Sequence, residues 1–169
     1  RVRGDAQRVF LYVTDLERWT DWFPGVSSAT RTNGMGNQSA TVGNRFKLQQ
    51  RLAGFDVLTT YEVSRVEDWR RVVLAGRSAL HTSTMQLVVL PDPNDPRFTL
   101  VRFVAAFEAG DGGWQAAALR PLVSGLVSKV PDEAMESLRR VLEGPASPLP
   151  GIQIPGESER RGRSASASG

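Results

Sequence analysis

Few side chains in this sequence could carry out chemistry. The chain has 169 residues, no cysteine and one histidine, His81. These counts exclude a disulfide framework, a thiol nucleophile and metal sites built from several histidines or cysteines. His81 lies in a segment predicted as a strand, on the face that it shares with Met85 and Leu87. It could act as a general base or polarise a ligand carbonyl, and the alternative is a hydrogen-bonded structural histidine.

Other polar residues on predicted strands could hold an oxygen atom of a ligand: Thr59, Tyr61, Ser83 and Arg102. The sequence contains no G-x-S-x-G element and no H-E-x-x-H helix, which excludes the hydrolases and metalloproteases that use these motifs. The segment Gly34-Met35-Gly36 lacks the third glycine of a dinucleotide fingerprint. We therefore assign no catalytic residue, and we expect no metal and no cofactor.

Three carboxylates lie close together in the sequence, at Asp15, Glu17 and Asp21. Clustered carboxylates can carry out acid–base chemistry. Their neighbours Arg18 and Trp19 instead favour an exposed, charged helix start.

The composition is that of a soluble globular protein, with 40% hydrophobic and 23% charged residues. The length suits one domain, and no apolar run approaches the roughly 18 residues of a membrane span. A net charge of +3, from 21 basic and 18 acidic side chains, is too small to indicate a nucleic-acid binder. Because the chain begins at Arg1 without a methionine, we expect a fragment or a processed product and assign no compartment.

The first elements are predicted to be helical. Asp5 can cap a helix that ends near Asp15, because apolar residues that share one face recur at helical spacing: Val9, Phe10, Val13 and Leu16. A second helical turn is expected over Leu16 to Trp22, and Phe23-Pro24-Gly25 stops it.

Beyond residue 25 the apolar period changes from about 3.6 to about 2 residues, which predicts strands. Asn33-Gly34 favours a two-residue hairpin turn with a strand on either side. Along Arg45 to Leu52, the apolar residues Phe46, Leu48 and Leu52 alternate with polar ones, as in a sheet with one solvated face. Further strands are predicted at Phe55 to Val66, Arg71 to Gly76, Leu80 to Leu90 and Phe98 to Phe107, and together they form an antiparallel meander.

The last regular element is a long amphipathic helix. From Trp114 to Leu142 the apolar residues form a broad stripe at helical spacing, with interruptions at Pro121 and Pro131. This order of elements predicts an α+β fold in which a curved antiparallel sheet wraps around the C-terminal helix. Residues 145–169 are rich in Pro, Gly and Ser, so we expect a domain over residues 1–144 followed by a disordered tail.

The segment from Arg8 to Val26 carries the patterns Val-Phe, Val-x-Asp and Trp-x-x-Trp-x-Pro. Val42 to Phe46 adds a glycine before a strand, and Thr60 to Val63 a strand that follows it. In these residues the chain resembles the START-like helix-grip superfamily, also called SRPBCC or Bet v 1-like and often labelled polyketide cyclase/dehydrase, over about residues 1 to 143. The first strand departs from the family pattern, because it is reduced to Val2-Arg3-Gly4. We expect this strand to be truncated; if the chain lacked it altogether, one edge of the sheet would be left unpaired.

The resemblance implies a deep, mostly apolar cavity between the sheet and the C-terminal helix, which relatives use to hold lipids, sterols, quinones, plant hormones or polyketide intermediates. The residues assigned to bind the ligand are Trp19, Trp22, Phe46, Tyr61, His81, Met85, Phe103, Trp114, Leu122 and Leu126. Leu48, Val63 and Phe107 share their inward phase. The alternative is that these side chains fill a solid core. An empty pocket of about 300 Å³ would cost roughly 7 kcal/mol, so such a pocket must be occupied, wet or small.

Three functions fit these observations. The one adopted here is the binding or transport of a small hydrophobic molecule, such as a lipid, sterol, quinone or polyketide-like compound, because this needs only a pocket and a few polar anchors. The second is an enzyme of the polyketide cyclase or dehydratase kind, in which His81 or Tyr61 moves a proton. The third is an interaction module that contacts a partner or a membrane surface through its arginines and its tail. No nucleic-acid partner is expected.

Overall fold

The structure, a computed structural model, describes residues 1–33, 40–52, 55–67, 69–79, 81–109, 130 and 132–145. In these ranges seven strands form one antiparallel sheet in the order β1-β7-β6-β5-β4-β3-β2. The strands are β1 (Val2–Arg3), β2 (Val26–Arg31), β3 (Arg45–Leu52), β4 (Phe55–Glu67), β5 (Arg71–Arg77), β6 (His81–Pro91) and β7 (Phe98–Ala109). The helical elements are α1 (Ala6–Thr14), the 3-10 helix η1 (Leu16–Arg18), α2 (Trp19–Trp22) and a C-terminal helix over residues 132–143.

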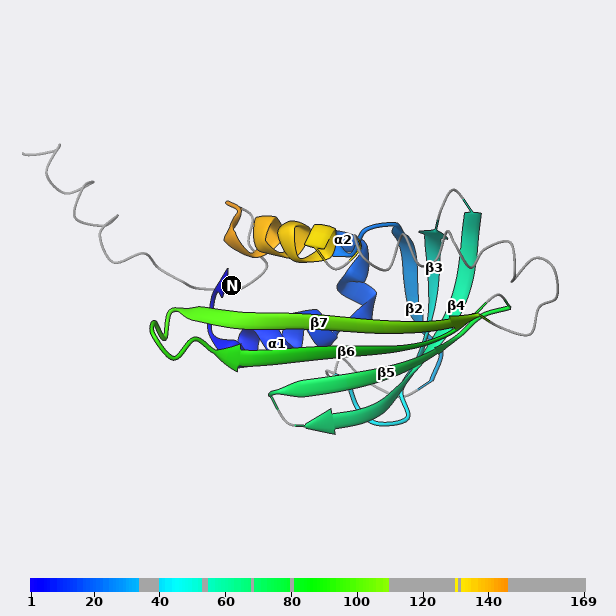
Figure 1. The fold of residues 1–169 in the computed structure, drawn as a ribbon, viewed down its shortest axis with the longest axis horizontal. Coiled ribbons are helices and arrows are strands. Elements are labelled where there is room, and N and C mark those ends of the chain that lie inside the picture. Colours follow the sequence, from blue (N-terminus) through cyan, green and yellow to red (C-terminus); the bar gives the residue numbers. More distant parts are fainter. Residues whose placement is uncertain are drawn as a thin grey trace, which may run out of the picture.

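The sheet is curled, and the helices lie on its inner side (Figure 1). Side chains from both layers form one hydrophobic core, which joins Val13 of α1 and Leu138 of the C-terminal helix to Phe46 and Leu74 of the sheet. The predicted α+β fold, with a curved sheet around a C-terminal helix, is therefore confirmed. Of the predicted helix from Trp114 to Leu142, residues 114–129 and Pro131 lie outside the described ranges, as do residues 146–169 of the predicted tail.

Helix α1 begins and ends where the sequence predicts. The Asp5 carboxylate accepts hydrogen bonds from the backbone N–H groups of Gln7 at 3.0 Å and Arg8 at 3.1 Å, which caps the first turn. The helix ends at Thr14, because Asp15 has an extended backbone. The Asp15 carboxylate then caps η1 through the N–H of Glu17. The second helical turn over residues 16–22 is confirmed as η1 and α2.

The alternation of apolar and polar residues in the sequence predicted the strands correctly, because it matches the alternating burial in the structure. In β6 the buried positions recur every second residue from His81 to Val89, and in β3 Phe46, Leu48 and Gln50 are buried between more exposed neighbours. Consecutive strands from β2 to β7 pair as neighbours, so the antiparallel meander is confirmed.

The prediction of a two-residue hairpin turn at Asn33-Gly34 is wrong. Arg31 pairs with Phe46, and the Thr32 N–H donates to the Arg45 carbonyl at 2.8 Å, so residues 33–44 connect the two strands. The Asn33 side chain donates to the Gly43 carbonyl at 2.9 Å and accepts from the Arg45 N–H, which holds the ends of this connection together. The asparagine thus acts through its side chain, between the two ends of a connection whose residues 34–39 lie outside the described part of the chain.

The short first strand is paired. Val2 lies opposite Thr99 and Arg3 opposite Phe98, so β1 covers the beginning of β7. The Thr99 hydroxyl donates to the Gly4 carbonyl at 2.7 Å, and the Arg3 N–H donates to the Glu143 carboxylate of the C-terminal helix at 3.0 Å. The short strand is therefore present, and β1 covers the edge of β7 at these two positions.

Candidate functional site

The inner face of the sheet changes from apolar to polar along its strands. In one half, Leu74 of β5 pairs with Met85 of β6, and both side chains are buried. Towards the β5–β6 turn, the paired positions hold Gly76 and a buried serine instead. We name the buried polar side chains on the strands of this half the inner polar cluster: Gln50, Thr59, Tyr61, His81 and Ser83.

Gly76 allows two members of the inner polar cluster to approach each other. A Cβ atom placed on Gly76 would lie 2.3 Å from Ser83 Oγ and 2.5 Å from Tyr61 Cε1. The Tyr61 ring and the Ser83 hydroxyl therefore occupy the space that any other residue at position 76 would need. This close approach is a use of glycine that local sequence patterns do not reveal.

His81 is buried, with 4% of its surface exposed, and its ring centroid lies 5.5 Å from that of Phe107. Its Nδ1 atom lies 2.9 Å from Ser78 Oγ, and its backbone N–H donates to the same oxygen at 3.0 Å. Burial lowers the pKa of the imidazole below its ordinary value, so the ring is neutral near pH 7. The other ring nitrogen, Nε2, is buried and has no hydrogen-bond partner in the described part of the chain.

Tyr61 and two hydroxyl side chains complete the polar half. The Tyr61 hydroxyl donates to Gln50 Oε1 at 3.5 Å. Burial raises the pKa of Tyr61 to about 12, an effect that the nearby Ser83 hydroxyl partly opposes. Thr59 Oγ1 and Ser83 Oγ are buried, and among the described residues neither forms a hydrogen bond of acceptable geometry. Thr59, His81 and Ser83 thus each have a buried polar atom that forms no hydrogen bond with the described residues.

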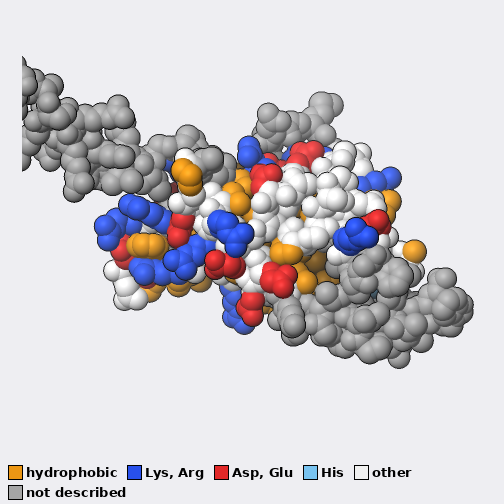
Figure 2. Space-filling model, turned by 90° about the horizontal axis from the view of Figure 1, so that it is seen from above, with side chains coloured by type: hydrophobic (Ala, Val, Ile, Leu, Met, Phe, Trp, Pro, Cys, Tyr) orange, Lys and Arg blue, Asp and Glu red, His pale blue; other side chains and the backbone are white. Residues whose placement is uncertain are grey.

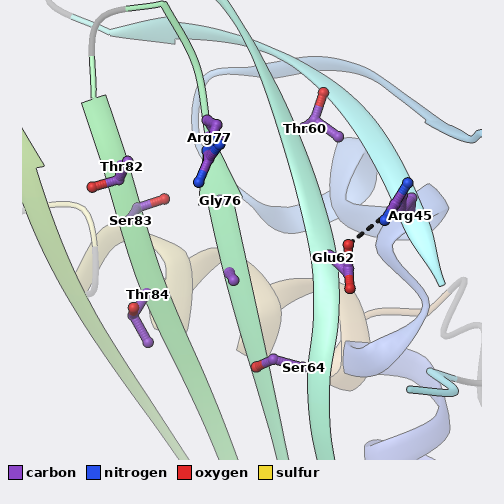
Figure 3. Close-up of a pocket in the computed structure, with 10 residues that line it drawn as sticks. Arg45, Thr60, Glu62, Ser64, Gly76, Arg77, Thr82, Ser83 and Thr84 are labelled. Carbon is purple, nitrogen blue, oxygen red and sulfur yellow. Dashed lines mark hydrogen bonds and ion pairs between the residues drawn. The ribbon is translucent and has the colours of Figure 1, made fainter. Parts of the chain in front are cut away.

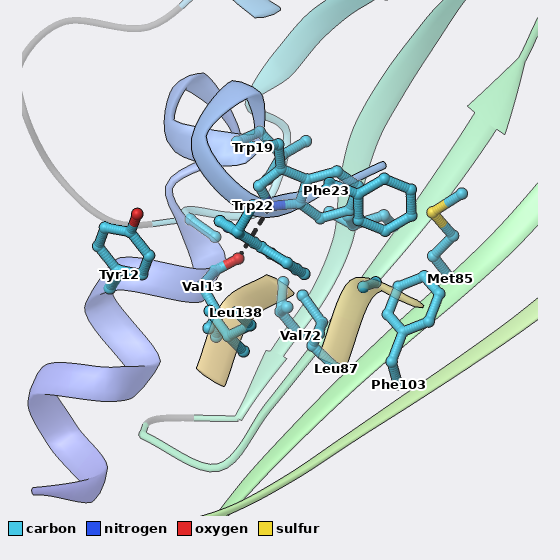
Figure 4. Packing of buried hydrophobic residues seen from close by; sticks show 14 of the residues in the cluster. Tyr12, Val13, Trp19, Trp22, Phe23, Val72, Met85, Leu87, Phe103 and Leu138 are labelled. Atoms are coloured by element: carbon cyan, nitrogen blue, oxygen red, sulfur yellow. Dashed lines mark hydrogen bonds between the residues drawn. The ribbon is translucent and has the colours of Figure 1, made fainter. Parts of the chain in front are cut away.

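An aromatic layer from α2 and the residue after it packs onto the sheet (Figure 4). Trp19 stacks on Phe23 with ring centroids 4.7 Å apart, and Phe23 meets Phe103 of β7 edge to face at 5.4 Å. On its other side, Trp19 lies 6.4 Å from the Tyr61 ring. The Trp19 indole N–H donates to the Val13 carbonyl at 3.0 Å, which fixes this ring to the end of α1. Trp19 therefore supports the inner face as a structural anchor.

The structure brings together most of the residues predicted to bind a ligand. Those in the core are Trp19, Trp22, Phe46, Tyr61, Met85 and Phe103, with His81 buried at the polar end and Phe107 packed against the core. Trp114, Leu122 and Leu126 lie outside the described residues. Sequence reasoning missed Phe23, Gln50 and Gly76. Gln50 could have been found, because it shares the phase of Phe46 and Leu48 on β3.

The remaining polar candidates do not join this site. Arg102 is exposed and lies on the outer face of β7, opposite Val88. Of the three acidic residues, Asp15 caps η1, Asp21 accepts a hydrogen bond from the Tyr12 hydroxyl at 3.1 Å, and Glu17 accepts one from the Arg31 N–H at 3.3 Å. Each carboxylate thus has a local structural role. Among the described residues, no group of three or more His, Cys, Asp and Glu side chains could hold a metal ion.

The outer face of the sheet has a separate hollow of about 750 Å³ across β3 to β6 (Figure 3). Hydroxyl side chains line it, together with Arg45 and Glu62, which form an ion pair at 2.8 Å. Gly76 and Ser83 also border it, so the outer hollow and the inner polar cluster lie back to back across one layer of backbone. Most of the side chains that line it carry a hydroxyl group or a charge, in contrast to the inner face.

The face seen in Figure 2 carries basic and acidic side chains interspersed over the described residues. Among the described residues, Arg1 pairs with Asp92 at 2.7 Å and Arg97 with Asp95 at 2.9 Å. No helix in the described ranges is long and apolar enough to cross a membrane.

Comparison with known proteins gives one family. The model of the family described as "Polyketide cyclase / dehydrase and lipid transport" matches residues 1–143. No curated protein is recognisably similar to this sequence.

Solved structures show the same fold at low sequence identity. The Zhui aromatase/cyclase from a Streptomyces species is 15% identical, with a TM-score of 0.65 over 99% of this chain and 94% of that one. A START superfamily protein from Mycobacterium smegmatis is 14% identical, with a TM-score of 0.55 over 76% of this chain and 91% of that one. A STAR-related lipid transfer protein from Xanthomonas axonopodis is also 14% identical, with a TM-score of 0.55 over 85% and 82%. At these identities the likeness concerns the fold alone.

Proposed function

The chain belongs to the polyketide cyclase / dehydrase and lipid transport family, and from this premise we propose that it binds a small hydrophobic molecule between the curled sheet and the C-terminal helix. The observation that carries the proposal is the lining of the inner face, where most of the buried side chains are apolar and a few polar ones lie at one end. Binding sites for small molecules typically combine an apolar wall with a small number of placed polar atoms.

Apolar and polar side chains of the inner face would make different contributions to binding. Met85, Phe103 and Phe46 offer apolar contact area, and Tyr61 and His81 offer polar atoms at one end. Each buried aromatic or aliphatic contact contributes through the apolar area that it removes from water, at about 25 cal/mol per Å². The polar atoms contribute less to affinity and determine how the molecule is oriented.

A second candidate, catalysis on the bound molecule, is favoured by one observation. The neutral His81 ring has its Nε2 buried and without a partner among the described residues, so in the tautomer protonated at Nδ1 its lone pair would be free to accept a proton from a bound molecule. This candidate predicts that His81→Ala abolishes turnover of a substrate while the protein stays folded. Binding alone predicts a change in affinity only.

A matched pair of alanines on β7 tests the binding proposal. Ala105 lies on the inner face, where it packs against the core beside Met85, and Ala106 is exposed on the outer face. Ala105→Phe should fill space on the inner face and lower the affinity for a hydrophobic dye such as Nile red by about tenfold or more, whereas Ala106→Phe should leave it unchanged. Native mass spectrometry and solvent extraction of the purified wild type should also reveal a bound small molecule. Equal dye binding by both variants, or no ligand and no dye bound by the folded wild type, would rule out the proposal.

A further inference from the structure

We propose that the molecule bound on the inner face carries an uncharged hydrogen-bonding head, a hydroxyl or carbonyl group, which Thr59, His81 and Ser83 hold, and that its apolar body extends towards Met85 and Phe103. This inference rests on the proposed function and specifies its ligand. It follows from which polar atoms are unsatisfied, where they lie and what charge surrounds them.

Three buried side-chain atoms without a partner lie at one end of the inner face, whereas others, such as Trp22 Nε1 and Arg71 Nε, lie elsewhere in the described residues. Thr59 Oγ1, His81 Nε2 and Ser83 Oγ are buried without a hydrogen-bond partner among the described residues. The exposed fractions of these residues are 0%, 4% and 6%. Buried polar side chains nearly always have a partner, so three that lack one, on two strands separated only by β5, indicate a group that this part of the chain does not supply.

The backbone register places these residues at one end of the inner face. Thr60 of β4 pairs with Arg77 of β5, and one residue beyond this pair lie Thr59 and Ser78. Ser78 is also the residue whose hydroxyl contacts the His81 ring. Ser83 pairs with Gly76, which lies two positions further into the sheet than Ser78. Strands β4 and β6 are about 10 Å apart, with β5 between them, which suits a ring or a short head with one or two oxygen atoms.

The chemistry of these groups fits a neutral head. A hydroxyl can donate or accept a hydrogen bond, and a neutral imidazole does either at Nε2 according to its tautomer. Burial lowers the pKa of His81, in keeping with a neutral ring. A ligand hydroxyl or carbonyl oxygen can therefore satisfy these atoms without a compensating charge.

The charge of the described residues around this end disfavours an ionised head. The described inward-facing side chains of β4 to β7 include no Asp, Glu, Lys or Arg. On β2, Arg31 lies opposite Phe46 with its guanidinium carbon 5.2 Å from the Phe46 ring centroid, and it approaches the Glu17 carboxylate at 3.9 Å. The positive charge of Arg31 is thus already accompanied by a carboxylate. A buried carboxylate, phosphate or amine on the ligand would remain unpaired at a high cost.

Three probes with one ring system test the inference by equilibrium dialysis at pH 7: naphthalene without a head, naphthol with a neutral hydroxyl, and naphthoate with a negative charge. Naphthol should bind about tenfold more tightly than naphthalene, as one or two hydrogen bonds allow, and naphthoate should bind most weakly. The double variant Thr59→Val with Ser83→Ala should lose the preference for naphthol. Thr82→Val, a change between His81 and Ser83 on the opposite face of β6, should keep it.

The outcomes separate this inference from the proposed function. Naphthoate or naphthalene binding as tightly as naphthol would overturn the neutral head and leave the hydrophobic site intact. No binding of any probe by the folded wild type would overturn both. Melting of the ligand-free variants gives an independent readout, because removing an unsatisfied buried hydroxyl should leave the melting temperature unchanged or raise it. A clear loss of stability in Thr59→Val would show that its hydroxyl already has a partner and would overturn the inference.

Discussion

Replacing Gly76 by alanine would place a methyl group where the structure holds two other side chains. The new Cβ would lie 2.3 Å from Ser83 Oγ and 2.5 Å from Tyr61 Cε1, both well inside van der Waals contact. Ser83 can rotate its hydroxyl away. The Tyr61 ring is fully buried beside Trp19 and has little room to move.

The expected cost follows from these contacts. Overpacking of a core by one methyl group costs about 1–3 kcal/mol, and the lower flexibility of alanine in the unfolded chain returns about 0.4–1 kcal/mol. Gly76→Ala should therefore destabilise the protein by about 1–2 kcal/mol, which lowers the melting temperature by about 2–8 °C for a domain of this size. Urea unfolding followed by circular dichroism measures the free energy directly.

A double-mutant cycle identifies the cause. Ser83→Ala removes the atom nearest to the new methyl group, so Gly76→Ala should cost at least about 0.5 kcal/mol less in that background. Ala75→Val, an exposed change one residue away on the outer face, should stay within about 0.5 kcal/mol of the wild type. A Gly76→Ala protein as stable as the wild type, or an equal cost with and without the Ser83 hydroxyl, would refute the packing described here.

Three further predictions address other parts of the structure. Because burial lowers the pKa of His81 in the folded state, the unfolded state binds the proton first as the pH falls, so stability should be lost from about pH 6.5 downward. Urea unfolding at pH 7 and pH 5 should show a smaller loss in His81→Gln, and equal losses would contradict the buried neutral ring. Asp5→Ala should destabilise the protein by about 1 kcal/mol, because two backbone N–H groups lose their acceptor. Asp5→Asn should retain most of the stability. Equal melting temperatures of the wild type and both variants would argue against the cap. Leu138→Ala should destabilise the protein by about 2–5 kcal/mol, because Leu138 is fully buried. Leu11→Ala, at an exposed position, is the control. Similar small effects of the two substitutions would show that the C-terminal helix is not docked on the core.

The sequence predicted the elements well because burial on one face leaves a periodic trace. The strand from Arg71 and the strand that begins beside Leu80 were placed to within a residue at their described ends, since apolar side chains alternate along both. The failure at Asn33-Gly34 has the opposite cause. Local turn preference there yields to strand register, which the burial of Phe46 and Leu48 sets from the far side of the loop.

The candidate site was only partly predictable, because its geometry arises between strands. His81, Tyr61, Thr59 and Ser83 could be named as polar residues on strands, but the sequence contains no sign that they share one end of the inner face. The role of Gly76 depends on a ring from the neighbouring strand, and a glycine near a turn carries no local signal of that contact.

The hydrogen bond between the Arg3 N–H and the Glu143 carboxylate joins segments 140 positions apart. Glu143 also receives the Arg139 guanidinium at 3.0 Å, so the seam between β1 and β7 and the end of the C-terminal helix share one carboxylate. These segments should consequently open as one cooperative unit, and their amide protons should exchange with solvent at matching rates. Fraying of β1 would then weaken the packing of the C-terminal helix against the sheet.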